Sequence, residues 1–251
     1  MSLRIISWNV LHIVHELNYV DNSPVIQKYP IEKNRIELIY KKIMLMIDGS
    51  TIISLQEVPF DLLQLLLNNK NNYNIEFHKY RRLPSIKNPD IVNPYIDSSE
   101  HLVTIYPIKL FPIIKSSFDL DNQSKGALII KFNNGITVVN VHVPIIQQNI
   151  YIPDDSRKTL FKTIINTVKD DNYIIIGDFN SKNYQLKKDM YFNKNIIIPE
   201  IDGNTRKCIK NNKIVYTKLD HIILNNIDYI ITFIDNEEDD LSDHKYIGII
   251  V

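Results

Sequence analysis

Polar side chains interrupt or end a series of apolar runs along this chain of 251 residues. The motifs that contain them, in chain order, are ISWNV with Asn9, ISLQEV with Glu57, VNVHVP with His142, IIIGDFNS with Asp178 and Asn180, KLDHIIL with Asp220, and LSDHKYIGI with Asp243 and His244. Any one of these side chains is most simply a turn residue or a satisfied core group. Because the strand ends of a layered α/β domain form one rim, the six motifs together predict a shared site.

The side-chain types in these motifs favour a hard cation bound through oxygen. Four carboxylates accompany two imidazoles and two carboxamides, a set that suits Mg²⁺ or a similar ion. Zinc is disfavoured, because the motifs contain neither a close pair of histidines nor a cluster of cysteines. A cation held in this way stabilises charge on a phosphoryl group and activates water. The expected chemistry is therefore the hydrolysis of phosphate esters.

The elements that must position these groups are short apolar strands. Nine are predicted, at residues 3–8, 52–55, 102–106, 127–132, 136–143, 173–177, 219–224, 229–233 and 246–251, and most are too continuous for burial on one face only. Three helices are predicted from apolar residues at helical spacing, at 31–47, 60–67 and 155–168. Strands buried on both faces imply sheets packed against another layer on each side, so the predicted fold class is α/β.

The segments between these elements are polar. Residues 84–100 and 182–195 are rich in Asn, Asp, Pro and Lys and are predicted to be surface loops. The acidic run 235–240 is predicted to be a solvated turn, and Lys42 is placed on the solvent face of helix 31–47. No internal repeat or long linker divides the chain, so residues 1–251 are expected to form one domain.

Composition narrows the class of protein. The formal net charge is zero, whereas proteins with a large nucleic-acid footprint usually carry a positive excess. Cys208 is the only cysteine, which excludes an intramolecular disulfide and favours an intracellular compartment, cytoplasmic or nuclear. The segment MSLRIISWNV lacks the apolar run of a secretory signal, and no stretch is long and apolar enough to span a bilayer. We expect a monomer.

Taken together and in this order, ISWNV, SLQEV, VNVHVP, GDFNS, KLDHIIL and LSDH resemble the motifs of the endonuclease/exonuclease/phosphatase superfamily, the deoxyribonuclease I-like fold. The resemblance runs from Trp8 to His244. It implies a four-layer α/β/β/α sandwich of two packed mixed sheets, with helix 31–47 covering one sheet, helix 155–168 covering the other, and the site at one rim. GDFNS and the WNVL opening are most similar to the deadenylase, nocturnin and 2′,5′-phosphodiesterase branch.

The resemblance also implies a magnesium site. Glu57 would be the main ligand of Mg²⁺, with Mn²⁺ as a substitute. Asn9 and Asp243 would lie beside it and bind the ion directly or through water. Mg²⁺ commonly keeps several waters and few protein carboxylates, so one or two direct ligands are sufficient.

The remaining motif residues would act on the phosphate and the attacking water. By the same resemblance, Asp178 would orient or deprotonate the water, and Asn180 would hold that water or a phosphate oxygen. His244, with its imidazole bound by Asp220, would donate to a phosphate oxygen or act as the base. His142 would give a second contact to the phosphate. In-line attack then needs no covalent intermediate.

Three further histidines lie next to these motifs. His221 follows Asp220, but side chains alternate along a strand, so His221 is expected to point away from it and to be structural. His12 and His15 follow the first motif, and we assign them only a minor share of the function.

Some motifs depart from the family pattern. QEVPF lacks the lysine that follows the glutamate in the AP-endonuclease branch, and Ile145 stands where that branch has asparagine. Both differences disfavour abasic-site repair. HLVTIYPI replaces the usual glycine-containing strand, and Leu241 replaces a proline that is frequent before SDH.

Three hypotheses for the substrate follow. The leading one is a nuclease that cleaves RNA or DNA, supported by the cluster HKYRRLP and by Tyr80 and Tyr95 as candidates to stack on bases. The alternative is a phosphatase or phosphodiesterase of a small molecule, such as a phosphoinositide or a nucleotide, which the zero net charge slightly favours. A catalytically silent binding module is a lesser alternative, because all the groups carried over from the family are intact.

Overall fold

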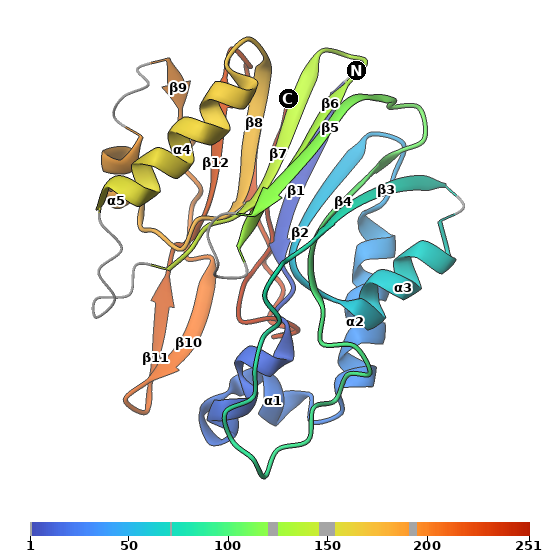
Figure 1. Ribbon diagram of the computed structural model, residues 1–251, viewed down its shortest axis with the longest axis vertical. Coiled ribbons are helices and arrows are strands. Elements are labelled where there is room, and N and C mark those ends of the chain that lie inside the picture. The colour runs from blue at the N-terminus through green and yellow to red at the C-terminus, as the bar shows by residue number, and fades with distance from the viewer. Residues whose placement is uncertain (1, 71, 120–124, 146–153, 191–194) are drawn as a thin grey trace.

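The computed structural model describes residues 2–70, 72–119, 125–145, 154–190 and 195–251, and two six-stranded sheets dominate it (Figure 1). The first sheet has the order β13 (Ile231–Ile234), β14 (Ile247–Ile250), β1 (Arg4–Asn9), β2 (Thr51–Pro59), β4 (Glu100–Pro107) and β3 (Tyr73–Lys79). The second has the order β5 (Pro112–Asp119), β6 (Gly126–Phe132), β7 (Ile136–His142), β8 (Asn172–Asp178), β12 (Asp220–Asn225) and β9 (Ile196–Ile197). Both are mixed, because the pairs β1–β2 and β7–β8 are parallel and the other neighbours are antiparallel.

Helices cover the outer face of each sheet. α2 (Glu32–Met46) and α3 (Phe60–Asn68) lie on the first sheet, and α4 (Asp154–Val168) and α5 (Asn183–Asp189) lie on the second (Figure 1). A separate apolar cluster fills each interface between helices and sheet, and a third cluster joins the two sheets face to face. The predicted four-layer α/β/β/α sandwich is thus confirmed. No helix in the described ranges is long and apolar enough to cross a bilayer.

The strands and helices that sequence patterns miss are the ones without a continuous apolar run. β3 and β5 are edge strands with alternating or mostly exposed side chains, and the hairpin β10 (Arg206–Lys210) and β11 (Lys213–Thr217) stands outside both sheets. α1 (Pro24–Lys28) is a single short helix. The segment 182–195, predicted to be a loop, contains α5, while its residues 191–194 lie outside the described ranges.

The acidic run 235–240 is solvated only in part, because residues 236–238 are exposed and Asp235 is buried, and Lys42 does not point freely into solvent. The Lys42 Nζ lies 2.7 Å from Asp235, 2.9 Å from Glu237 and 2.6 Å from Asp239. Asp235 is buried, so its carboxylate requires a charged partner. These ion pairs therefore bind the run to α2. The run connects β13 to the motif that precedes β14.

Candidate active site

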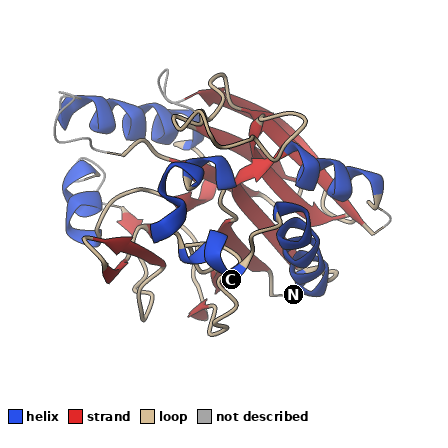
Figure 2. Cartoon of the chain, turned by 90° about the horizontal axis from the view of Figure 1, so that it is seen from below, coloured by secondary structure: helices blue, strands red, loops and turns tan. Residues whose placement is uncertain are grey.

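The strand register brings the predicted polar residues to one end of the sandwich. Asp178, the last residue of β8, is paired with His142 of β7 on one side and with Asp220 of β12 on the other. Asn9 ends β1 in the other sheet, and its Nδ2 lies 3.1 Å from Asp178 Oδ2 and 3.1 Å from Glu57 Oε1. A single carboxamide therefore links the rims of the two sheets. Figure 2 views the molecule from below, the end toward which β1 runs in Figure 1.

The close approach of β7 and β8 explains why a glycine, Gly177, precedes Asp178. A Cβ at residue 177 would lie 1.9 Å from the carbonyl oxygen of Val141, and φ there is +154°. Only glycine allows β7 and β8 to approach this closely. After the strand, Asn180 adopts φ of 47°, and its backbone N–H donates to Asp178 Oδ1 at 2.8 Å. This tight turn fixes the Asp178 carboxylate at the rim.

Asp178, Asp220 and His244 form a buried cluster, called here the paired-strand triad. His244 Nδ1 lies 2.8 Å from Asp220 Oδ2, and His244 Nε2 lies 3.8 Å from Asp178 Oδ2. The His244 backbone is also fixed, because its carbonyl accepts from the Trp8 indole at 3.0 Å. The triad therefore holds an imidazole between two carboxylates with little freedom to move.

In the triad, the pKa values of His244 and Asp178 are both raised, but they lie on opposite sides of neutral pH. Burial opposes charge on His244, but Asp220, Asp243 and Asp178 together raise its pKa to about 10. Burial also raises the pKa of Asp178 to about 6, against the lowering effect of the His244 charge. At neutral pH the site thus presents a hydrogen-bond donor on His244 beside a carboxylate with a pKa suited to accepting a proton.

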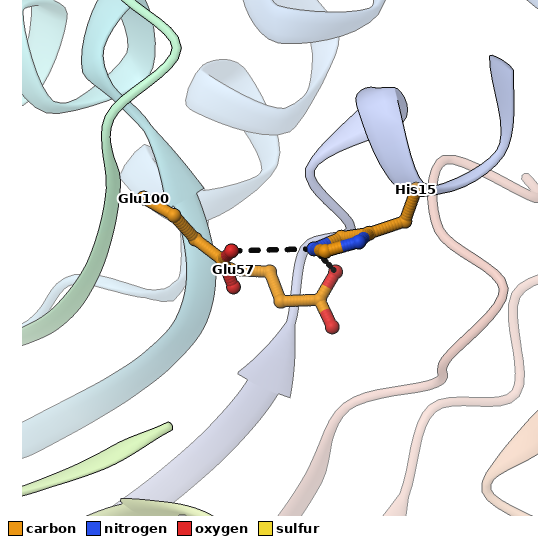
Figure 3. Close-up of side chains that lie close together, drawn as sticks. All are labelled: His15, Glu57 and Glu100. Atoms are coloured by element: carbon orange, nitrogen blue, oxygen red, sulfur yellow. Dashed lines mark hydrogen bonds and ion pairs between the residues drawn. The ribbon is translucent and has the colours of Figure 1, made fainter. Parts of the chain in front are cut away.

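His15, Glu57 and Glu100 form a second cluster on the first sheet, called here the Glu57 cluster (Figure 3). Glu57 lies in an irregularity of the β2–β4 pairing and has φ of 55°, a backbone conformation rarely adopted by residues other than glycine. Its carboxylate accepts from the His12 backbone N–H at 3.2 Å and lies 3.7 Å from His15 Nε2. The irregular backbone thus turns the Glu57 carboxylate toward a cavity that Asp178 and His244 also line.

The charge on Glu57 is stabilised by cations around it. Burial disfavours that charge, but the charges of His15 and Lys125 hold the pKa of Glu57 well below its usual range. Lys125, just before β6, places its Nζ 3.9 Å from Glu57 Oε1 and 2.5 Å from His142 Nε2. Burial, and then the Lys125 charge, lower the pKa of His142 well below its usual value. His142 is therefore neutral and can accept a hydrogen bond.

Asp243 reaches the same space from the segment before β14. Its Oδ2 accepts from Arg206 Nε of the β10–β11 hairpin at 2.7 Å, while its Oδ1 is buried and has no hydrogen-bond partner among the described residues. Asp243, Glu57, Asp178, Asn180 and His244 all line one cavity of about 240 Å³. An unsatisfied carboxylate oxygen that shares a cavity with other carboxylates fits a hard cation.

The structure thus gathers all eight predicted residues at one rim, with one difference in detail. These are Asn9, Glu57, His142, Asp178, Asn180, Asp220, Asp243 and His244. Asn9 Oδ1 accepts from the Leu11 backbone N–H at 3.0 Å, and its Nδ2 faces the two carboxylates. In this arrangement Asn9 orients Glu57 and Asp178.

Four residues at the rim escaped the sequence prediction or were given little weight: His15, Glu100, Lys125 and Arg206. Glu100 and Lys125 each stand at or just before the start of a buried strand, which is the same signal that identified Asp220. His221 behaves as expected, because its Nε2 lies 2.6 Å from the Ser181 carbonyl oxygen, away from the rim.

Tyr80 and Tyr95 are not available for base stacking, contrary to the sequence prediction. They are 1% and 6% exposed. The Tyr80 hydroxyl lies 3.2 Å from His142 Nδ1, and the Tyr95 hydroxyl donates to Glu32 Oε1. Their rings are apolar enough to fill the interior while each hydroxyl finds a polar partner. The exposed Arg81 instead pairs with Asp119 at 3.3 Å.

No known family model matches the chain, and no curated protein matches it. Solved structures do match its fold. An endonuclease/exonuclease/phosphatase from Bacteroides vulgatus superimposes with a TM-score of 0.68 at 16% identity, over 100% of this chain and 98% of that one. The catalytic domain of human Nocturnin with a bound sulfate anion gives 0.66 at 16% identity, over 99% and 92%. TDP2 from D. rerio, complexed with a single strand DNA product, gives 0.64 at 15% identity, over 99% and 98%. The chain therefore has the deoxyribonuclease I-like fold.

Proposed function

We propose that this protein is a metal-dependent phosphoesterase and that its substrates are phosphodiesters in nucleic acid. The observation that carries the proposal is the position of Asp178. Its Oδ2 is within 3.8 Å of His244 Nε2 and within 3.1 Å of Asn9 Nδ2, which also binds Glu57. Asp178 thus lies beside the charged imidazole of His244 and is linked through Asn9 to Glu57, whose carboxylate suits a cation. Asp178, His244 and Glu57 line one cavity that is open to a ligand.

The donor set of the cavity fits Mg²⁺, with Mn²⁺ as a substitute. Glu57 and Asp243 would hold the ion, and Asn9 would keep Glu57 oriented toward it. When bound, a divalent cation supplies positive charge to the phosphate oxygens. Its binding would satisfy the buried Asp243 Oδ1, which has no hydrogen-bond partner among the described residues.

The chain's own residues would provide the rest of the chemistry. Asp178 would accept a proton from the attacking water, because its pKa of about 6 makes it a competent base at neutral pH. His244 Nε2 would donate to a non-bridging phosphate oxygen as negative charge develops there. Asp220 would hold the imidazole in position through Nδ1. Asn180 and His142 would fix the orientation of the water and of the phosphate.

A basic hollow beside the cavity supports a nucleic-acid substrate. It lies between α5 and the β10–β11 hairpin and is lined by Lys182, Lys187, Lys218 and Tyr216. Lys182 is two residues from Asn180 of the site. Three lysines and an exposed tyrosine suit the phosphates and bases of a single strand that continues beyond the scissile bond.

A small phosphate ester is the second candidate. It is supported by the zero net charge of the chain and by the burial of both tyrosines that were candidates for base stacking. Such a substrate needs only the cavity and not the neighbouring hollow. We further propose that residues 1–251 act as one intracellular, monomeric domain.

A substrate panel tests the proposal. A polyadenylate oligomer, an abasic duplex, a 5′-tyrosyl oligonucleotide and an inositol polyphosphate are each incubated with the protein, with and without Mg²⁺ and with chelator. We expect metal-dependent cleavage of at least one oligonucleotide. Cleavage of the inositol phosphate alone would support the second candidate. Undiminished activity in chelator, or no hydrolysis of any substrate, would contradict a metal-dependent phosphoesterase.

A further inference from the structure

Glu100, the first residue of β4, is a buried carboxylate for which the proposed function has no use. It is fully buried, and its Oε1 has no hydrogen-bond partner among the described residues. Its Oε2 lies 3.2 Å from His15 Nε2 (Figure 3). A carboxylate that is hidden from water and left half unsatisfied is unfavourable without a further charged partner.

The neighbouring carboxylate increases the negative charge around His15. Glu57 Oε2 lies 3.7 Å from the same His15 Nε2, so one imidazole faces two buried carboxylates. Lys125 lies 3.9 Å from the other oxygen of Glu57, and its charge also acts on Glu100. His142 Nδ1 lies 4.0 Å from Glu100 Oε1, but this imidazole is neutral, so His15 is the charged side chain that pairs directly with Glu100 among the described residues.

The spacing of the three ligand groups matches the coordination sphere of a small cation. Atoms bound at about 2.1–2.2 Å to an octahedral ion lie about 3 Å apart when they are adjacent. The distances from His15 Nε2 to the two carboxylates are 3.2 and 3.7 Å, and one ligand atom from each residue lies within 4.8 Å of the others. A modest movement of the side chains would place an ion between them.

An ion has a route to this position from outside. The side chain of His15 is 35% exposed, and both His15 and Glu57 line the cavity of the proposed active site. His15 belongs to a 3₁₀ turn, Ile13–His15, that lies beyond the end of β1. The open side of the imidazole therefore allows a cation to enter without unfolding β4.

We propose that His15, Glu57 and Glu100 form a second divalent-cation site that shares Glu57 with the site of the proposed function. The site prefers Mn²⁺ to Mg²⁺, because imidazole nitrogen is a better ligand for transition metals than for Mg²⁺. The inference rests on the proposed function only through the shared Glu57. Two cations bridged by one carboxylate would place their combined charge at one side of the phosphate.

Counting Mn²⁺ ions on the full chain, without substrate, tests this site directly. Equilibrium dialysis of the wild-type protein against Mn²⁺ alone, read by electron paramagnetic resonance, is expected to give two ions per chain. Glu100→Gln and His15→Gln should each bind one ion, and Asp243→Asn should keep the ion of the Glu57 cluster. His78→Gln is the matched control, because His78 also pairs with a carboxylate, Asp119 at 2.9 Å, and this variant should bind two.

The outcomes separate this site from the proposed function. One Mn²⁺ on the wild-type chain, or two on both Glu100→Gln and His15→Gln, would overturn the second site even if the protein cleaves phosphodiesters. Two ions on a chain that hydrolyses nothing would refute the proposed function and leave the site standing. Thermal melting of each variant checks the fold. If Glu100→Gln unfolds, the partly exposed His15→Gln variant decides.

Discussion

The paired-strand triad and the Glu57 cluster lie at the same rim, but they are built in different ways. The triad sits on regular strand ends, where Asp178 and Asp220 are directly paired and His244 is locked by Asp220 at 2.8 Å. The Glu57 cluster sits on irregular backbone, with Glu57 at φ of 55° and His15 in a 3₁₀ turn. The charges of the triad are paired with one another and need no ligand. In the Glu57 cluster, cationic side chains surround the carboxylates that we propose bind metal ions.

This difference predicts the largest effects for the triad. Asp178→Asn and His244→Ala should each lower turnover by about 10²–10³-fold or more, because each removes a group that we propose acts in the transition state. Substrate binding and the fold should be largely retained. The double variant should be little worse than the poorer single variant, since residues that act in one step lose activity non-additively. Single-turnover assays with Mg²⁺ measure all three variants.

Two results would break this half of the comparison. Losses that multiply in the double variant would show that Asp178 and His244 act in separate steps. Near-normal turnover of His244→Ala would show that the triad does not take part in the reaction at all.

The Glu57 cluster should respond to metal concentration, unlike the triad. Glu57→Gln keeps the shape of the side chain and removes the charge that attracts a cation. Turnover should fall by on the order of 10²-fold at limiting Mg²⁺ and recover in part at high Mg²⁺, because binding follows mass action. Titration of activity with Mg²⁺ for Glu57→Gln and Asp178→Asn measures the contrast. Wild-type activity of Glu57→Gln at limiting metal, or equal rescue of both variants, would remove the distinction.

Asp220 sharpens the comparison through pH. Asp220→Asn removes the largest of the charges that raise the pKa of His244 to about 10 against the opposing effect of burial. The pKa of His244 should fall, so the protonated imidazole should be lost at lower pH than in the wild-type protein. The alkaline limb of the kcat profile should therefore move toward neutral pH, with turnover at pH 7 reduced about tenfold to hundredfold. An unchanged alkaline limb would mean that His244 does not act as the donor.

The smallest effect is expected at His12, beneath the Glu57 cluster, and it concerns stability. His12 is buried against the Tyr95 ring, and burial followed by the charge of His15 lowers its pKa to about 3. The unfolded chain takes up a proton near pH 6.5 and the folded chain does not, so stability falls as pH drops below about 6.5 toward 3. His12→Phe should remove up to about 1.4 kcal/mol per pH unit of this dependence. Urea unfolding at pH 7 and pH 5 compares the two proteins, and equal losses would contradict the prediction.

The two halves of the rim also differ in how far sequence alone can find them. Asp178, Asp220 and His244 terminate or precede apolar runs that are strands, so their convergence follows from the sheet geometry. Glu100 and Lys125 carry the same signal, but Glu100 ends the polar segment 84–100, which is predicted to be a loop, and Lys125 lies outside every predicted element. His15 depends on a turn whose path follows from the positive φ of Leu11 at 59° and has no periodic pattern. Regular elements are predictable in this way, and irregular ones are not.

Most of the fold follows from continuous apolar runs, and the exceptions have a common cause. The hairpin β10–β11 has short apolar runs flanked by charged residues and no buried residue on either strand, so it has no core signal. The burial of Tyr80 and Tyr95 depends on partners distant in sequence, His142 and Glu32, which no local pattern reveals. Helical spacing places Lys42 on the solvent face, but Asp235 of the acidic run that binds it is 193 residues away in sequence.

The position of β14 has a consequence for when the rim of the sandwich is assembled. β14 lies inside the first sheet, between β13 and β1, and Asp243 and His244 immediately precede it. A nascent chain that has emerged only through β12 already carries Asn9, Glu57 and Asp178, but the first sheet has a gap where β14 belongs. The imidazole therefore joins the carboxylates only once β14 has been synthesised and inserts beside β1. A nascent chain without β14 is thus expected to lack the complete rim.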